Sequence, residues 1–504
     1  MSKNGGDRRG SSGAAKPDAG TVAAVTGRWF WWAATAAGLI LRFALLPAGT
    51  RHGYLYDHDD FVRWGIQATD HGLATLYQGP PPRSDMQRWT DGRWVTTQRT
   101  LDRVCNYPPL STYLLYASGL AFQAVSDDRL INTLTSRAIF SFWSILGDVL
   151  TAWGCAALVA RFRPGPAGPW TFLGVLFAPP LWWDSAVWGQ MDAIIMAPTV
   201  WMLWAMCGRR WLLAGVLYGA AAALKPQAVL FLPVWALAVA TARPFWRPLV
   251  AAPVAALVVA AASLPYLLHD GFTWFHRSYV ENLLHAYTVT TLKAFNLWYV
   301  DLLRCDSADS AATWLGVSKD LWGKGFLLAG LAAGFAWTLW RWRHRPQALV
   351  LWSGVSLLLL VMLPTRVHER YLVVVTPFLV VTAVLWKRFW PGLLLLAITA
   401  TAQVSWPSWL TEPAGNWTAF ERRLAAGYEA QLAAAPPEHR DRFPSLEEYL
   451  EPARKQYQQR RSDNAPFEWL FTALALAGTA AVLTAFVSLR PEPDRPAAAE
   501  RWGP

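Results

Sequence analysis

The sequence has little cysteine and few charges for its length. Its 504 residues include four cysteines, none of them in a CxxC or Cys/His pattern, which argues against a zinc site. Charged residues make up 16% of the chain. The formal net charge is +11, but the basic residues cluster in short loops between apolar runs, which argues against a nucleic-acid-binding protein. We therefore expect no obligatory metal, no other cofactor and no nucleic-acid partner, and leave open whether the clustered Asp residues bind a metal.

Two further absences concern membrane insertion. The first apolar run lacks a convincing small-residue cleavage site, so it is interpreted as a retained anchor rather than a signal peptide. The two halves of the chain share no repeated motif, whereas many transporters are built from inverted repeats. The absence of a repeat therefore argues against a transporter built from inverted repeats.

Long apolar runs and tryptophan are abundant instead. Hydrophobic residues make up 54% of the chain, and its 32 tryptophans belong to a residue type enriched at membrane–water boundaries. Because a spanning helix needs roughly 20 apolar residues, we expect an all-α, polytopic integral membrane protein. About twelve spans are predicted, at residues 28–47, 137–160, 170–187, 192–207, 211–224, 226–240, 247–268, 322–340, 347–363, 371–386, 389–405 and 467–489.

The basic loops orient these spans. If residues 1–27 form a disordered cytoplasmic tail and the spans alternate, every short basic loop falls on the cytoplasmic side. If the apolar segment 110–125 crossed the membrane, all later spans would reverse direction and the basic loops would face outward. We therefore place this segment at the membrane–water interface. The prediction is a multi-pass protein of the plasma (inner) membrane with both termini in the cytoplasm. Its expected parts are a transmembrane module 28–405 with an external loop 48–136, an external helical cap 406–466, a last span 467–489 and a tail 490–504.

Acidic and basic motifs converge on the opposite, external side. The first external loop contains "YDHDDF", in which Asp57 and Asp59 are both candidates for a general base. Asp60 is interpreted as the N-cap of a helix that begins near Phe61. Four side chains from distant parts of the chain fall on the same side and suit the binding of an anionic phosphate: Lys225, Arg366, His368 and Arg370.

One base and a group of cations suit the transfer of a sugar from a lipid phosphate to a hydroxyl. The base would take the proton of the acceptor, and the cations would stabilise the charge that develops on the leaving phosphate. Nucleotide sugars are made in the cytoplasm, so an external site would need a lipid-carried donor. The expected partners are the lipid bilayer, a polyprenyl-phosphate sugar donor and a glycan, lipid or protein acceptor.

These motifs resemble the GT-C class of membrane glycosyltransferases, especially bacterial relatives of the glucosyltransferases that extend lipid-linked oligosaccharides. The similar elements are, in order, "DHDDFVRW", "NYPPLSTYLLY", "WDSAVWGQMDAI", "ALKPQAVLFLPV", "KAFNLW" and "VHERY", within about residues 28–405. The resemblance implies a GT-C fold with Asp57 as the catalytic base. It also implies that Lys225 and the "RVHER" cations contact the donor phosphate. Asn106 departs from the pattern, since an Asp is common at this position.

The resulting prediction is a hexosyltransferase for a mannose- or glucose-like sugar. Further substrate contacts are expected from six residues: Tyr107, Gln190, Asp192, Gln227, Asn296 and Glu369. A membrane transporter or a flippase for lipid-linked sugars is the main alternative, and a non-catalytic assembly subunit is a third. The choice between Asp57 and Asp59 and a disulfide between Cys105 and Cys305 are left open.

Overall fold

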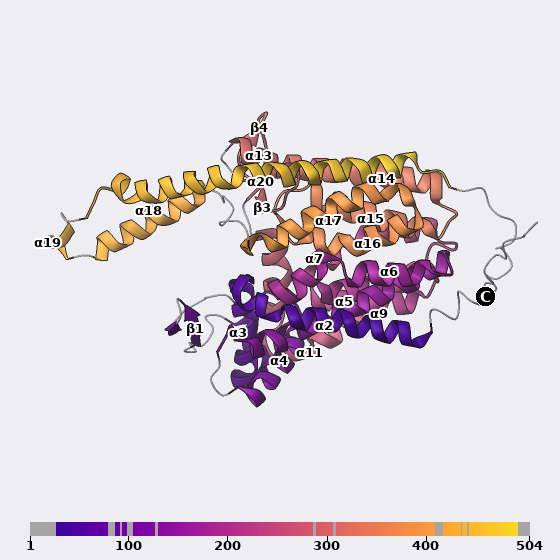
Figure 1. Ribbon diagram of the computed structural model, residues 1–504, viewed down its shortest axis with the longest axis horizontal. Helices are drawn as coiled ribbons and strands as arrows, with labels where there is room; N and C mark the ends of the chain where they lie inside the picture. The colour runs from indigo at the N-terminus through magenta and orange to yellow at the C-terminus, as the bar shows by residue number, and fades with distance from the viewer. Residues whose placement is uncertain are drawn as a thin grey trace, which may run out of the picture.

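The structure is a computed structural model, and helices dominate it (Figure 1). It describes residues 27–78, 86–90, 93–97, 104–126, 130–285, 289–305, 309–408, 417–434, 436–440 and 443–491. The all-α class expected from the sequence is therefore confirmed, with short strands as the exception.

The N-terminal half of the chain alternates long helices with short turns. Its helical elements are α2 (Arg28–His52), α3 (Leu55–His71), η1 (Leu73–Tyr77), α4 (Pro109–Val125), α5 (Leu134–Phe162), α6 (Ala167–Leu176), α7 (Pro179–Trp182), η2 (Trp183–Trp188), α8 (Ala193–Cys207), α9 (Trp211–Leu224), η3 (Pro226–Phe231) and α10 (Leu232–Thr241).

The C-terminal half has the same character and ends in the longest described helix. Its helical elements are η4 (Arg247–Val250), α11 (Ala251–Asp270), α12 (Thr273–Phe275), η5 (His276–His285), α13 (Leu297–Cys305), α14 (Lys319–Trp342), α15 (Gln347–Met362), α16 (Tyr371–Leu385), η6 (Lys387–Phe389), α17 (Trp390–Ser405), η7 (Trp406–Ser408), α18 (Trp417–Ala434), α19 (Pro437–Arg440) and α20 (Leu446–Ser488).

The strands are short and pair locally, with one exception. β1 (Met86–Thr90) and β2 (Arg93–Thr97) form an antiparallel hairpin, as do β4 (Thr313–Trp314) and β5 (Val317–Ser318). The exception is β3 (Thr291–Leu292), which pairs in parallel with β6 (Val367–His368), more than seventy residues further along the chain.

Apolar helices account for most of the predicted membrane spans, the exception being residues 322–340 in α14. Among the described residues, five helices are long and apolar enough to cross a membrane: Trp29–His52, Leu134–Phe162, Arg247–Asp270, Lys387–Ser408 and Leu446–Ser488. Six shorter apolar helices of 10–17 residues accompany them. The predicted apolar segments lie mainly on helical residues, and the chain is a multi-pass membrane protein.

One predicted span is broken in the structure. Residues 170–187 do not form one helix, because α6 ends at Leu176 and is followed by α7 and the π-helical turn η2. Pro179 and Pro180 lack an amide hydrogen, so they start a new helical segment instead of continuing the old one. The break brings η2 close to α2.

The end of the bundle that carries α3 and β1 also carries a helical projection (Figure 1). There, α18 packs beside the first part of α20, and both extend beyond the bundle (Figure 1). A capping box between Ser445 and Glu448 starts α20, which then continues for 43 residues. The expected boundary between cap and last span, at residues 466 and 467, therefore lies inside one continuous helix.

Two clusters of buried apolar side chains hold the bundle together. The larger one joins α5, α6, α8, α15, α16 and α17. The smaller one joins α3, α4 and η1 with residues from α5 and α11. The site described below lies where α3 approaches the segment between α15 and α16.

Candidate active site

Helix α3 forms one wall of the site. Four of its residues recur at intervals of three or four positions, share one face of the helix and line a cavity: Asp57, Asp60, Phe61 and Trp64. The helix begins at Leu55 and its N-cap residue is Tyr54, so the interpretation of Asp60 as an N-cap is wrong. The acidic cluster instead occupies the first two turns, where carboxylates are stabilised by the helix dipole.

Two extended segments form the opposite wall. Besides the pairing of β3 with β6, the amide of Glu369 donates to the carbonyl oxygen of Leu292 at 3.0 Å. Lys293 and Arg366, at the ends of this pairing, have φ angles of 62° and 63°. Such left-handed conformations cost a residue with a Cβ roughly 1–2 kcal/mol and are often found at functional sites.

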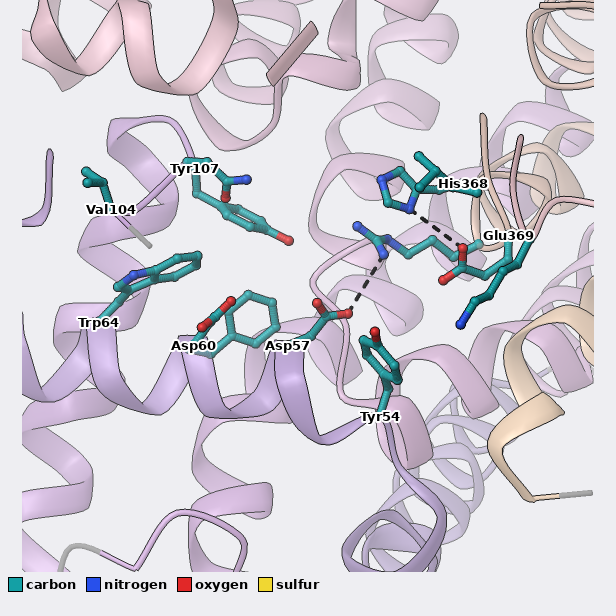
Figure 2. Close-up of a pocket in the computed structure, with 13 residues that line it drawn as sticks. Tyr54, Asp57, Asp60, Trp64, Val104, Tyr107, His368 and Glu369 are labelled. Carbon is teal, nitrogen blue, oxygen red and sulfur yellow. Dashed lines mark ion pairs between the residues drawn. The ribbon is translucent and has the colours of Figure 1, made fainter. Parts of the chain in front are cut away.

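The walls enclose a cavity of about 380 Å³ (Figure 2). Figure 2 shows Trp64, Asp60 and Tyr107 on one side of Asp57, and His368 and Glu369 on the other. The remaining lining residues are Tyr54, Phe61, Val104, Asn106, Leu292, Lys293 and Arg370. Asp57 thus separates a side rich in aromatic rings from a side that carries the cationic residues.

Asp57 is held through one of its two carboxylate oxygens. Its Oδ2 accepts hydrogen bonds from Nε1 of Trp188, at 2.9 Å, and from the side-chain amide of Gln190. Nη1 of Arg370 lies 3.8 Å from the same oxygen. No residue that the structure describes donates a hydrogen bond to Oδ1. Asp57 therefore has a fixed orientation and one oxygen left for a ligand.

The last residue of η2, Trp188, and the turn that follows it supply the two donors to Asp57. Nη1 of the buried Arg137 donates to the carbonyl oxygen of Trp188 at 2.9 Å. Gly189 follows with a φ of 84°, which allows the chain to turn sharply. The hydroxyl of Tyr107 donates to Oε1 of Gln190 at 3.3 Å. Trp188 and Gln190 are thus held from two directions before they reach Asp57.

Charged neighbours set the protonation of the opposite wall. Burial disfavours charge on Arg370, but Asp57 and Asp192 raise its pKa well above the usual value. Burial and the adjacent Arg370 lower the pKa of His368, so this imidazole is neutral near pH 7. Its Nδ1 lies 3.6 Å from Oε2 of Glu369. Burial opposes ionisation of Glu369, but His368 and Arg370 lower its pKa, so it stays a carboxylate.

A second pair of charges lies behind Arg370. Nε of Arg370 is 3.3 Å from Oδ2 of Asp192, and Oδ1 of Asp192 accepts a hydrogen bond from Nζ of Lys225. The side chains of Asp192 and Lys225 are 1% and 2% exposed. Asp57, Arg370, Asp192 and Lys225 thus form a chain of alternating charges that leads from the cavity into the protein.

The sequence comparison assigns this site to a family. A sequence profile described as glycosyltransferase family 87 matches residues 106–364, which is more than half of the chain. The chain belongs to glycosyltransferase family 87. The match confirms the predicted membrane glycosyltransferase of the GT-C class, and with it a transferase as the class of enzyme. Asp57 and the segment 366–370 lie outside the matched residues, so their roles depend on the geometry of this chain.

Two other comparisons were made for the family-87 protein, with curated protein sequences and with solved structures. No curated protein matches its sequence significantly. A solved structure with a similar arrangement is that of ArnT from Cupriavidus metallidurans bound to undecaprenyl phosphate. It shares 12% sequence identity with this chain at a TM-score of 0.39, over 92% of this chain and 76% of ArnT. This similarity is too low to transfer residue roles.

The structure brings several predicted site residues of the glycosyltransferase together. Asp57, Tyr107, His368, Glu369 and Arg370 line the cavity. Gln190 and Asp192 do not line the cavity, but Gln190 donates a hydrogen bond to Asp57 and Asp192 forms an ion pair with Arg370. Lys225 does not line the cavity, because its ammonium group is turned towards Asp192.

Four other predicted residues point elsewhere. Asp59 is buried on another face of α3, where Oδ2 lies 3.9 Å from Nη2 of Arg63. Nε of Arg366 lies 3.2 Å from Oδ1 of Asp320, since the left-handed conformation of Arg366 directs its side chain away from the cavity.

The two amides serve the packing of the surrounding segments. Gln227 donates to the hydroxyl of Tyr371 at 2.9 Å. Asn296 donates to the carbonyl oxygens of Val361 and Pro364, at 3.4 and 3.3 Å. Neither Gln227 nor Asn296 is among the described residues that line the cavity.

Three contributors were missed by the sequence analysis. Lys293 lines the cavity beside the "RVHER" segment, Asp60 adds a second carboxylate, and Trp188 holds Asp57. Lys293 is the first residue of the motif "KAFNLW", so a charge in a predicted external loop was the signal available for it. Cys105 is a buried free thiol, so it does not form the disulfide with Cys305 that the sequence left open.

Proposed function

We propose that this family-87 protein transfers a hexose from a polyprenyl-phosphate donor to a hydroxyl of an acceptor. The observation that carries the proposal is the state of Asp57, which is fixed through Oδ2 and offers Oδ1 to the cavity. This is the arrangement a general base needs, because it must reach the proton that it removes without reorienting. Family membership supplies the reaction class.

In the proposed reaction, the acceptor oxygen bonds to the anomeric carbon while the bond between that carbon and the phosphate oxygen breaks. The acceptor proton passes to Oδ1 of Asp57. The leaving polyprenyl phosphate gains one negative charge, which Arg370 and Lys293 stabilise from the opposite wall. A neutral His368 contributes a hydrogen bond rather than a charge.

The aromatic side of the cavity favours a sugar ring as the acceptor. The ring centroids of Trp64 and Phe61 lie 5.9 and 5.5 Å from that of Tyr107, at interplanar angles of 55° and 89°, so the three rings form an angled aromatic surface. Such a surface suits the apolar C–H face of a sugar, and Asp60 and Asn106 at its edge can bind hydroxyl groups. A glycan is therefore proposed over an unglycosylated lipid or protein.

The proposed site faces the outside of the plasma membrane. The support is the distribution of charge in the sequence, since the short basic loops would all lie on the cytoplasmic side. The start of α2 and the end of α20 lie at one end of the bundle, and α3 lies towards the other (Figure 1). This arrangement suits termini and active site on opposite sides of the membrane.

A transfer assay with two matched variants tests this function. Purified protein is incubated with a radiolabelled polyprenyl-phosphate hexose and a membrane extract that contains acceptors. Asp57→Asn should lower the transfer rate by about 100- to 10,000-fold, the usual contribution of a general base. Asp59→Asn, a matched change on another face of the same helix, should leave the rate within about threefold of wild type.

Other outcomes would contradict the proposal. Transfer by Asp57→Asn at the wild-type rate would remove Asp57 from the chemistry. If wild-type protein moved the labelled lipid across vesicles but transferred no sugar, the protein would be a flippase.

A further inference from the structure

Lys225 occupies an unusual position for a residue predicted to bind phosphate. It lies at the junction of α9 and η3, with 2% of its side chain exposed. Its ammonium group donates to Asp192 and lies 5.2 Å from the ring centroid of Tyr107. Both neighbours separate Lys225 from the cavity, so a donor phosphate bound there would meet Arg370 first.

Asp192 is shared between two cations. Its Oδ1 faces Lys225, and its Oδ2 lies 3.3 Å from Nε of Arg370. The guanidinium of Arg370 continues to Asp57, at 3.8 Å. The nearby buried carboxyl of Asp184 also interacts electrostatically with Lys225 and Asp192. Lys225 is therefore the cation that offsets Asp192 from the side away from the cavity.

We infer that Lys225 is a positioning residue that acts on Arg370 through Asp192. While Lys225 neutralises Asp192, Arg370 can direct its charge towards Asp57 and the cavity. Without Lys225, the buried Asp192 would have Arg370 as its nearest cation, and the attraction between them would draw the guanidinium away from the leaving phosphate. The inference deepens the proposed function and rests on it.

The variants Lys225→Met, Asp192→Asn and the double variant separate this role from direct phosphate binding. The assay measures kcat and KM with a radiolabelled polyprenyl-phosphate hexose, and the binding of unlabelled polyprenyl phosphate. Lys225→Met should lower kcat/KM by at least about tenfold. In the double variant the buried negative charge is gone too, so kcat/KM should return to within about threefold of Asp192→Asn alone.

A direct phosphate ligand would behave differently. If Lys225 contacted the phosphate, removal of Asp192 would not compensate for its loss. The double variant would then be as inactive as Lys225→Met or worse, and would bind polyprenyl phosphate equally poorly, which overturns the inference. If Lys225→Met does not fold, the double variant alone decides, because only a positioning role leaves it active.

A matched control separates stability from positioning. Nζ of Lys319 lies 2.7 Å from Oδ2 of Asp301, and neither residue lines the cavity. Lys319→Met should lower the unfolding temperature and leave kcat/KM unchanged. If wild type neither transfers sugar nor binds polyprenyl phosphate, the proposed function fails. If wild type is active but the double variant shows no recovery, only the inference about Lys225 fails.

Discussion

Substitution of Arg370 by lysine tests whether its fork geometry matters. Nε of Arg370 lies 3.3 Å from Asp192, and Nη1 lies 3.8 Å from Asp57, so one planar group serves two carboxylates in different directions. A lysine keeps the charge but has a single ammonium group, so it cannot approach both carboxylates and a phosphate at once. We therefore expect Arg370→Lys to lose one charge-assisted contact.

The expected fall in kcat/KM follows from the free energy that one charge-assisted hydrogen bond contributes. Hydrogen bonds to charged groups contribute about 1.5–3 kcal/mol, and 1.4 kcal/mol corresponds to about tenfold in rate. Arg370→Lys should therefore lower kcat/KM by about 10- to 150-fold. If the contact is made to the leaving phosphate in the transition state, kcat should fall along with kcat/KM.

Arg366→Lys is the matched control on the same segment. Arg366 pairs with Asp320 at 3.2 Å and is 29% exposed, away from the cavity. Such half-exposed pairs contribute about 0–1 kcal/mol, so kcat/KM should change by less than about fivefold. Both variants are measured by steady-state transfer of a radiolabelled hexose. Equal losses in the two variants would refute the assignment of Arg370 to the cavity.

Three further predictions follow from single residues. Lys293→Met should raise KM for the lipid donor by about five- to tenfold with a smaller change in kcat, because it removes one cation from the cavity wall; an unchanged KM would exclude a donor contact. Gly189→Ala should destabilise the protein by at least about 1–2 kcal/mol, because φ at this position is 84° and the new Cβ would lie 3.1 Å from Nη1 of Arg137. Thermal unfolding measures this loss, and an unchanged unfolding temperature would contradict the turn geometry. Burial raises the pKa of the Cys105 thiol to about 12, so the peptide that contains it should resist maleimide at about pH 7.5 in the folded protein and react after denaturation, as seen by mass spectrometry.

Hydropathy predicted the helices because every segment that crosses a bilayer needs apolar side chains. A segment that crosses the bilayer must be apolar along its length, whatever it packs against. The segment 170–187 shows the limit of this signal. It is mostly apolar, but Pro179 and Pro180 interrupt it, and η2 then carries Trp188 into the site.

The helical period explains which acidic residues reach the cavity. Successive residues of an α-helix are rotated by about 100°, so Asp59 is turned by about 200° from Asp57, whereas Asp60 returns to within about 60° of it. The choice between Asp57 and Asp59 was open in the sequence because the start of the helix was misplaced. Once α3 begins at Leu55, the period puts Asp57 and Asp60 on one face.

The cationic residues could be predicted as a group but not one by one. The sequence indicates that residues 366–370 and 225 lie at the same border of the membrane. It does not reveal that Arg366 adopts a left-handed conformation, because this depends on the pairing of β3 with β6. Nor does it reveal that Asp192 stands between Lys225 and the cavity.

The most direct test of the account is an experimental structure with polyprenyl phosphate bound. In that structure the phosphate should lie against Arg370, in the cavity between α3 and β6, with Oδ1 of Asp57 facing the space left for the acceptor. Reacting groups must approach to about 3–3.5 Å, so the phosphate must lie within one sugar ring of Asp57. A phosphate bound more than about 10 Å from Asp57 would contradict the account.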